Sequence, residues 1–242
     1  MKRACIFIGP TRLDTQVREA FDVYGPASLG SVFRATKRGY KKIILIDGYF
    51  GNVPSVWHKE ILYAISEGVD VSGAASIGAL RAAELFRFGM KGFGIIFRLY
   101  RRGILTDDDE VCVLHSVREL DFAPMSHAMI NVRFTLRRMH EAGYLTPADA
   151  DAVCIHMKRL HFADRTDEQL SKIAVTLPNV GNTFLSKFHE YYDDVKRRDA
   201  VGLCQQVMLM PHNPVISDWN FPETIHWKNQ FENQVSDIPD LA

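Results

Sequence analysis

The chain lacks a net charge, and its few cysteines are widely separated. Lysine and arginine together number 29, as do aspartate and glutamate, so no overall field draws the protein to nucleic acid or to an anionic membrane. We therefore expect neither as a partner. The four cysteines are too far apart for the paired ligands of a zinc site or for a disulfide framework. We expect buried thiols at Cys5, Cys112, Cys154 and Cys204.

Long hydrophobic runs are missing as well. The apolar segment that follows the basic pair Lys2 and Arg3 ends at Gly9 and Pro10, which makes it too short for a signal peptide. No later segment reaches the ~18 consecutive apolar residues of a membrane span. The sequence therefore predicts a cytoplasmic protein.

The usual motifs for cofactors are also absent. The first predicted strand is followed by Gly9, Pro10 and Thr11 rather than by a Gly-x-Gly-x-x-Gly or P-loop sequence. The nine histidines include no His-x-x-x-His pair. The acidic run from Asp107 to Glu110 offers oxygen ligands for a hard cation such as Mg²⁺, but consecutive side chains of an extended run point to opposite faces. We expect no cofactor and no metal.

The residues that are present predict an α/β fold. With 242 residues, of which 47% are hydrophobic, the chain can bury a sizeable core. Helical periodicity at residues 31–38 and 54–67, with short connections, predicts a small, mostly parallel sheet that is flanked by helices. The runs that we interpret as its strands are rich in β-branched residues and lie at 5–8, 43–46, 69–71 and, more weakly, 111–114.

Beyond about residue 120 the strand signals stop. Helical patterns follow at residues 126–142, 147–161, 167–175 and 181–210. We therefore divide the chain into an α/β core, residues 1–120, which carries the site, and a helical region, residues 121–242, which packs with the core as one compact unit. After Pro211, prolines and aromatics interrupt any regular period, which favours an ordered loop on the body. The aromatics of this tail either provide a partner surface or fasten the tail to its own core; they are Trp219, Phe221, Trp227 and Phe231.

The segment GAASIGALRAAE, residues 73–84, is unusually rich in small residues. It follows the apolar residues 69–71 and begins a helical stretch, so Ser76 is predicted at a turn from strand to helix. A fold can present a nucleophilic serine there, beside the free N–H groups of the helix. The alternative is an alanine-rich helix that packs tightly on a neighbour, with Ser76 as its N-cap.

The helix at residues 54–67 offers two candidate bases. Successive residues of a helix are rotated by about 100°, so His58, Lys59 and Glu60 cannot all face one pocket. Periodicity places His58 within the apolar stripe, and Lys59 on the opposite side near Tyr63. By periodicity alone His58 is the better candidate, although a lone histidine can be a core residue and Lys59 a surface ammonium.

Three further side chains are candidates for lining the site. Asp47 follows a predicted strand and can orient a base or a ligand, or it can cap its own turn. Arg81 and Glu84 lie three residues apart on the helix after Ser76. At that spacing we expect them to pair with each other and to line the site.

Taken together, several motifs resemble the core of the TfuA-like proteins over roughly residues 5–145. In order, they are FIGPT, IDGYF, VPSVWHKEIL, GAASIGALRAAELFRFGMKG, TDDDEV and SHAMINVRFTL. The chain departs from the family pattern at Gly25, where a Pro-Pro pair is usual, at Ser31, where aspartate is usual, and at Ile77, where methionine commonly follows the serine. None of these departures removes a chemical group from the presumed centre.

The resemblance implies a partner of YcaO enzymes in the conversion of a peptide backbone amide to a thioamide. Family members are thought to hydrolyse the C-terminal thiocarboxylate of a ThiS-like sulfur carrier and to help the YcaO enzyme engage its peptide. The implied centre is a Ser–Lys pair, which carries over to Ser76 and Lys59 within hydrogen-bond reach. Lys59 must then be buried, because only a neutral lysine can accept the serine proton. The N–H groups of Ile77 and Gly78 are the expected oxyanion donors.

Two alternatives stay open on the sequence. The protein can be a non-catalytic adaptor that positions the YcaO enzyme and the sulfur carrier. It can also be a general serine hydrolase or peptidase, because GAAS-x-G resembles the serine motif of ClpP-like proteases as well.

Overall fold

The computed structural model describes residues 4–51, 53–177, 183–211 and 219–232. Contacts within the chain divide it into two compact units. The first consists of Met1–Leu105 with Arg197–Ala242, and the second of Thr106–Lys196. This division differs from the boundary that we placed at residue 120, because the chain returns to the first unit after the second.

The first unit is built on a parallel sheet of five strands in the order β2-β1-β3-β4-β5. The middle of the sheet is almost entirely buried, as expected for a parallel sheet that is covered on both faces. The predicted α/β class is therefore confirmed. The strands are β1 (Ala4–Phe7), β2 (Asp22–Tyr24), β3 (Lys42–Leu45), β4 (Asp70–Gly73) and β5 (Lys91–Gly92).

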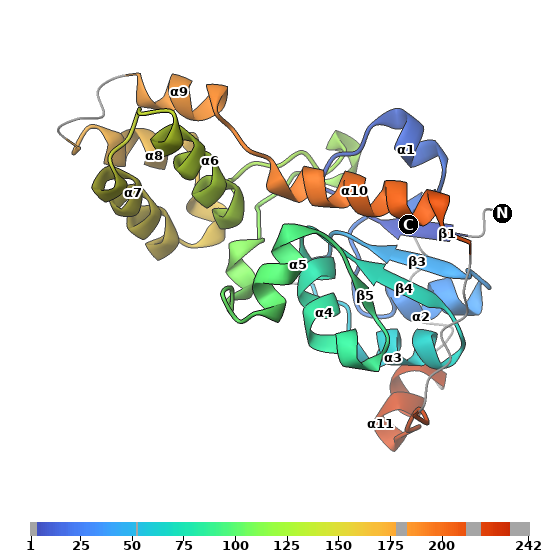
Figure 1. Ribbon diagram of the computed structural model, residues 1–242. Coiled ribbons are helices and arrows are strands. Elements are labelled where there is room, and N and C mark those ends of the chain that lie inside the picture. Colours follow the sequence, from blue (N-terminus) through green and yellow to red (C-terminus); the bar gives the residue numbers. More distant parts are fainter. Residues whose placement is uncertain (1–3, 52, 178–182, 212–218, 233–242) are drawn as a thin grey trace. The chain divides into compact units, whose positions relative to one another are not determined.

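Helices cover both faces of this sheet (Figure 1). One face carries α2 (Ser31–Lys37), α3 (His58–Ser66) and α4 (Ile77–Leu85). The other carries α1 (Thr15–Glu19) and α10 (Val195–Leu209), and α5 (Gly94–Arg101) follows β5. On α10, Leu203 and Cys204 pack against Ile6 and Ile44 of the central strands. These apolar contacts hold α10 against one face of the sheet.

Three strand assignments differ from the sequence prediction. β2 and β5 were missed because they have only three and two residues, too few for a periodic signal. The predicted strand at residues 111–114 is wrong. Val111 and Cys112 are buried, but they follow the 3-10 helix η2 (Asp108–Glu110) and join no strand of the described sheet.

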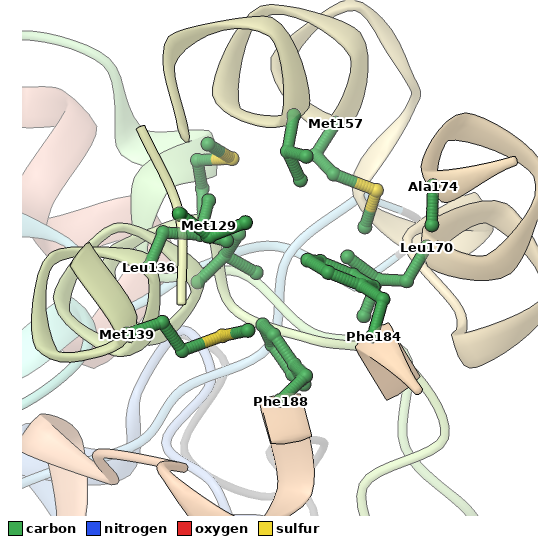
Figure 2. Close-up of a cluster of buried hydrophobic side chains, with 11 residues drawn as sticks. Met129, Leu136, Met139, Met157, Leu170, Ala174, Phe184 and Phe188 are labelled. Atoms are coloured by element: carbon green, nitrogen blue, oxygen red, sulfur yellow. The ribbon is translucent and has the colours of Figure 1, made fainter. Parts of the chain in front are cut away.

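The second unit is helical, as predicted. It contains α6 (Met129–Glu141), α7 (Pro147–Arg159), α8 (Asp167–Ala174) and α9 (Phe184–Glu190), with short 3-10 helices η3 (Arg118–Leu120) and η4 (Phe162–Asp164). Figure 2 shows its core, in which methionine and phenylalanine side chains from α6, α7 and α9 meet Leu170 and Ala174 of α8. The helix predicted at 181–210 is divided into α9 and α10, and its first two residues lie outside the described ranges. In those ranges, no helix is both long and apolar enough to span a bilayer.

The described part of the tail, residues 219–232, packs back onto the helices of the first unit. Its α11 (Ile225–Trp227) and π-helix η5 (Lys228–Glu232) place Trp227 and Phe231, both fully buried, against Phe33 of α2 and Tyr63 of α3. The ring centroids of Phe33 and Phe231 are 4.8 Å apart. These two aromatics therefore fasten this part of the tail to its own core, which is the second of the two alternatives that the sequence left open.

We expect the replacement Trp227→Ala to lower the free energy of unfolding by about 3–5 kcal/mol, the usual cost of removing a buried aromatic side chain. Ile225→Ala is the matched control, because Ile225 is 81% exposed on the same helix, and it should change stability by less than about 0.5 kcal/mol. Urea unfolding measures both. Equal midpoints for the two variants would mean that the tail does not dock as described.

Candidate functional site

The turn between β4 and α4 holds Ser76 in an unusual backbone conformation. Ala75 has a φ of 67°, a region that residues with a Cβ rarely adopt, and Ser76 has φ −117° and ψ −126°. Ser76 is the N-cap residue of α4, but its side chain does not cap the helix, and the residue is only 3% exposed. Its predicted place at a turn from strand to helix is confirmed.

Two glycines show why this segment is rich in small residues. A Cβ on Gly78 would overlap the carbonyl oxygen of Leu45 on β3, and a Cβ on Gly73 would overlap the carbonyl oxygen of Gly78. The N–H of Ala74 also donates to the Leu45 carbonyl, at 3.2 Å. The first turn of α4 is therefore pressed directly onto the backbone of β3.

Because of this close approach, one of the two predicted oxyanion donors is already hydrogen-bonded and the other is not. The N–H of Gly78 donates to the carbonyl oxygen of Ile46 at 3.2 Å, so this donor is already engaged within the fold, which does not favour its predicted role as an oxyanion donor. The N–H of Ile77 donates no hydrogen bond within the part of the chain that the structure describes. Ile77 thus offers the backbone donor beside Ser76.

Asp47 ties together the loops at the carboxyl ends of two strands. Its Oδ2 accepts hydrogen bonds from the N–H groups of Gly9 at 2.9 Å and Thr11 at 2.8 Å, and its Oδ1 accepts one from the Thr11 hydroxyl at 2.8 Å. Asp47 is buried at the end of β3, and the loop that it holds follows β1. These bonds favour a bracing role beneath the site over a role as a base.

His58 and Arg81 meet on one carboxylate at the surface. His58 Nε2 and Arg81 Nη1 each lie 2.7 Å from Glu84 Oε2, and Arg81 Nε donates to the Val56 carbonyl. Burial alone would raise the pKa of Glu84, but its hydrogen bonds to His58 and Arg81 outweigh this effect and lower the pKa. The predicted pair of Arg81 and Glu84 is confirmed. The His58 side chain is 42% exposed and contacts Glu84 of α4. It therefore does not lie in the buried apolar stripe of α3, where periodicity placed it.

Lys59 lies on a different side of α3 and binds the tail. Its Nζ donates to Thr224 Oγ1 at 2.7 Å and lies 5.5 Å from the centroid of the Phe221 ring. Ser76 is not among the described partners of this ammonium group. The structure thus does not join Lys59 to Ser76 by a hydrogen bond, and it places Lys59 on the side that periodicity indicated.

Glu60 has a role that the sequence analysis missed. This fully buried carboxylate accepts hydrogen bonds from the N–H groups of Gly30, Val32 and Phe33 at the start of α2, and from that of Trp57 at 2.8 Å. Desolvation by burial nevertheless raises the pKa of Glu60 to about 7, against the effect of these donors. A glutamate at the third position of a helix is a known capping signal, and it would have indicated the bond to Trp57.

The acidic run in the second unit forms an ion-pair cluster. Because Asp108–Glu110 is a 3-10 helix, carboxylate oxygens of Asp107, Asp109 and Glu110 come within 4.8 Å of one another, so the expectation that they diverge is wrong. The Lys158 ammonium lies among them, 3.0 Å from Asp107 and 2.9 Å from Glu110, and it also pairs with Asp109. A side-chain cation therefore occupies the position that a metal ion would take.

Comparison with known proteins finds one family. The model of the family described as TfuA-like protein matches residues 47–166, a range that contains Ser76, Lys59, the acidic run and α6. No curated protein matches the chain.

The pKa of Glu60 predicts a dependence of stability on pH. Because its folded-state pKa is raised from 4.5 to about 7, the unfolded chain loses this proton first, and the free energy of unfolding should fall as the pH rises from about 4.5 to 7. At about 1.4 kcal/mol per pKa unit, the fall is about 3 kcal/mol. Glu60→Gln should remove this part of the dependence. Urea unfolding at pH 5 and pH 7.5 checks the prediction, and identical pH dependence in the two proteins contradicts it.

Proposed function

The chain belongs to the TfuA-like family, and we propose that it serves a YcaO enzyme in peptide backbone thioamidation by hydrolysing the C-terminal thiocarboxylate of a ThiS-like sulfur carrier. The observation that carries this proposal is the strained turn between β4 and α4. It holds Ser76 at the start of a helix, beside the available N–H of Ile77. A nucleophile and an oxyanion donor are thereby adjacent in the chain.

The proposed reaction has two steps. Ser76 Oγ attacks the thiocarboxylate carbon while its proton passes to a base, and the N–H of Ile77 stabilises the resulting oxyanion. The C–S bond then breaks, the base returns the proton so that sulfide leaves as HS⁻, and the carrier is held as an ester on Ser76. In the second step water attacks this ester, which restores the serine hydroxyl and leaves the carrier with a carboxylate. The sulfide is released beside the YcaO enzyme.

Two residues of α3 are candidates for the base. The family resemblance favours Lys59, which would have to leave Thr224 and lose its proton before it could act. His58 is the second candidate because it faces α4. Its partner Glu84 lies eight residues beyond Ser76, about 12 Å along the helix axis, so the imidazole and Glu84 would both have to shift toward Ser76 before His58 could act. Glu84 would then orient the imidazole, as a carboxylate orients the histidine of a serine hydrolase.

Ser76→Ala should abolish sulfide release from the thiocarboxylated carrier and leave the binding of the carrier and of YcaO nearly unchanged, because the loss of one buried hydroxyl barely alters an interface. A sulfide assay and calorimetry measure the two properties. Ala83→Ser, a change of similar size at a partly exposed position of the same helix, is the control for folding. Undiminished hydrolysis by the Ser76 variant would refute the nucleophile.

The base can be identified by comparing Lys59→Met with His58→Gln. If Lys59 is the base, the first variant should lose at least about 100-fold in kcat, the usual contribution of general-base catalysis, whereas the second should stay within a few-fold of the parent. Combining Lys59→Met with Ser76→Ala should add little further loss, since the two residues would act as a unit. If His58→Gln instead shows the larger loss in kcat and Lys59→Met stays within a few-fold of the parent, the base is His58.

A non-catalytic adaptor is the competing proposal, and it is favoured by the burial of Ser76 and by the contact of Lys59 with Thr224. Sulfide release from the carrier by this protein alone distinguishes the two. If no sulfide forms, and the Ser76→Ala variant still supports thioamidation by YcaO at the normal rate, the protein is an adaptor. Cleavage of unrelated peptides or esters at comparable rates would instead indicate a general hydrolase.

A further inference from the structure

One segment of this neutral protein carries charge of a single sign. Between Glu84 and Asp107 the sequence contains five cations and no acidic residue. One of the five, Lys91, pairs with Asp70 at 2.6 Å. The other four are exposed arginines on and around the end of α4 and on α5, namely Arg87, Arg98, Arg101 and Arg102.

These four arginines lack the carboxylate partners that several other surface cations of the protein have. Arg137, Lys172 and Lys187, for example, each pair with a glutamate three or four residues away. Among the residues that the structure describes, no carboxylate pairs with the guanidinium of any of the four arginines. Their charge is therefore not neutralised by an ion pair within the described chain, although Arg98 acts at longer range on the carboxylate of Asp199.

The arginines share one surface, which we call the arginine patch. Phe86 lies at its centre, because the guanidinium carbon of Arg101 is 4.6 Å from the Phe86 ring centroid and that of Arg87 is 5.7 Å away. Arg98 lies one helical turn before Arg101 on α5. Two exposed apolar residues border these positions in the chain, Phe88 at 45% exposure and Ile104 at 64%.

Guanidinium groups without an ion-pair partner, beside exposed apolar side chains, are suited to bind an acidic protein surface. The planar guanidinium binds a carboxylate through two parallel hydrogen bonds, and arginine and aromatic residues are the side chains most often enriched at interfaces. A nucleic acid is the less suitable partner, because the whole chain has no net charge to attract a polyanion.

The distance from the patch to Ser76 suits a small partner with an extended end. Phe86 lies ten positions after Ser76, with the nine residues of α4 between them, which corresponds to about 15 Å at 1.5 Å per residue. An extended chain covers this distance in about four residues. A protein body that rests on the arginine patch can therefore deliver its C-terminus to the first turn of α4.

We propose that the arginine patch docks an acidic face of the sulfur carrier, so that the C-terminal segment of the carrier runs along α4 to Ser76. This inference rests on the proposed function for the identity of the carrier. The patch binds the body of the carrier and does not contact the reacting atoms. Its loss thus weakens binding and leaves the chemical step intact.

The test uses the full-length protein with Arg87→Glu and Arg101→Glu combined. The binding probe is the ThiS-like carrier with an ordinary C-terminal carboxylate, titrated by calorimetry at low and high salt. We expect Kd for the carrier and KM for its thiocarboxylate to rise at least tenfold, with kcat unchanged within about twofold. The salt dependence of binding should also become weaker in the variant.

Two further double variants complete the test, one as a control and one as a milder form of the charge reversal. Arg118→Glu with Arg138→Glu reverses two exposed charges in the second unit and should leave Kd unchanged. Arg87→Gln with Arg101→Gln removes charge without reversing it and should raise Kd by about threefold. This milder variant keeps the test valid if the charge reversal impairs folding, which the urea midpoint reveals.

The outcomes separate the docking surface from the proposed chemistry. If the parent protein hydrolyses the thiocarboxylate and the charge-reversed variant binds and hydrolyses it equally well, the docking proposal is overturned and the function stands. If the parent binds the carrier but releases no sulfide, and the variant loses binding, the docking proposal stands and the hydrolase does not. Loss of binding to YcaO or to RNA, with carrier binding intact, would also overturn the docking proposal.

Discussion

The contact between the first turn of α4 and the backbone of β3 is the constraint on which the candidate site depends. Gly78 can lie against the Leu45 carbonyl only because it has no Cβ. The helix must then begin immediately after β4, and the intervening turn is so tight that Ala75 adopts a positive φ. The position of Ser76 and the available N–H of Ile77 both follow from this contact.

The start of α3 shows how one short motif can serve three neighbours. Because successive residues of a helix are about 100° apart, His58 reaches α4, Lys59 reaches the tail, and Glu60 reaches the start of α2. Three adjacent polar residues thus hold three separate parts of the first unit to one helix. Their adjacency in the sequence does not mean that they share a pocket.

The sequence was most informative where structure is local. Strands β1, β3 and β4, the turn at Ser76 and the pair of Arg81 and Glu84 all follow from contacts between neighbouring residues or from a clear apolar run. The apolar run at 111–114 was wrongly predicted as a strand. Burial alone does not make a strand, because the backbone must also hydrogen-bond to a neighbouring strand.

The contacts that could not be predicted join distant residues. Lys59 and Thr224 are 165 positions apart, and no periodicity on α3 indicates which element will cover its outer side. The bonds from Glu60 to the start of α2 likewise depend on how two helices pack. The acidic run converges because its backbone coils into a 3-10 helix, which the assumption of an extended chain did not allow.

The return of the chain to the sheet through α10 has a consequence for synthesis. One face of the sheet is completed by Leu203 and Cys204, which a ribosome makes only after the whole of Thr106–Lys196. At about 5–20 residues per second, this delay is roughly 5 to 18 seconds. During that interval the apolar side chains of Ile6 and Ile44 have been made, but their cover has not. The nascent chain therefore passes through a stage in which these side chains are open to contacts that α10 blocks in the finished protein.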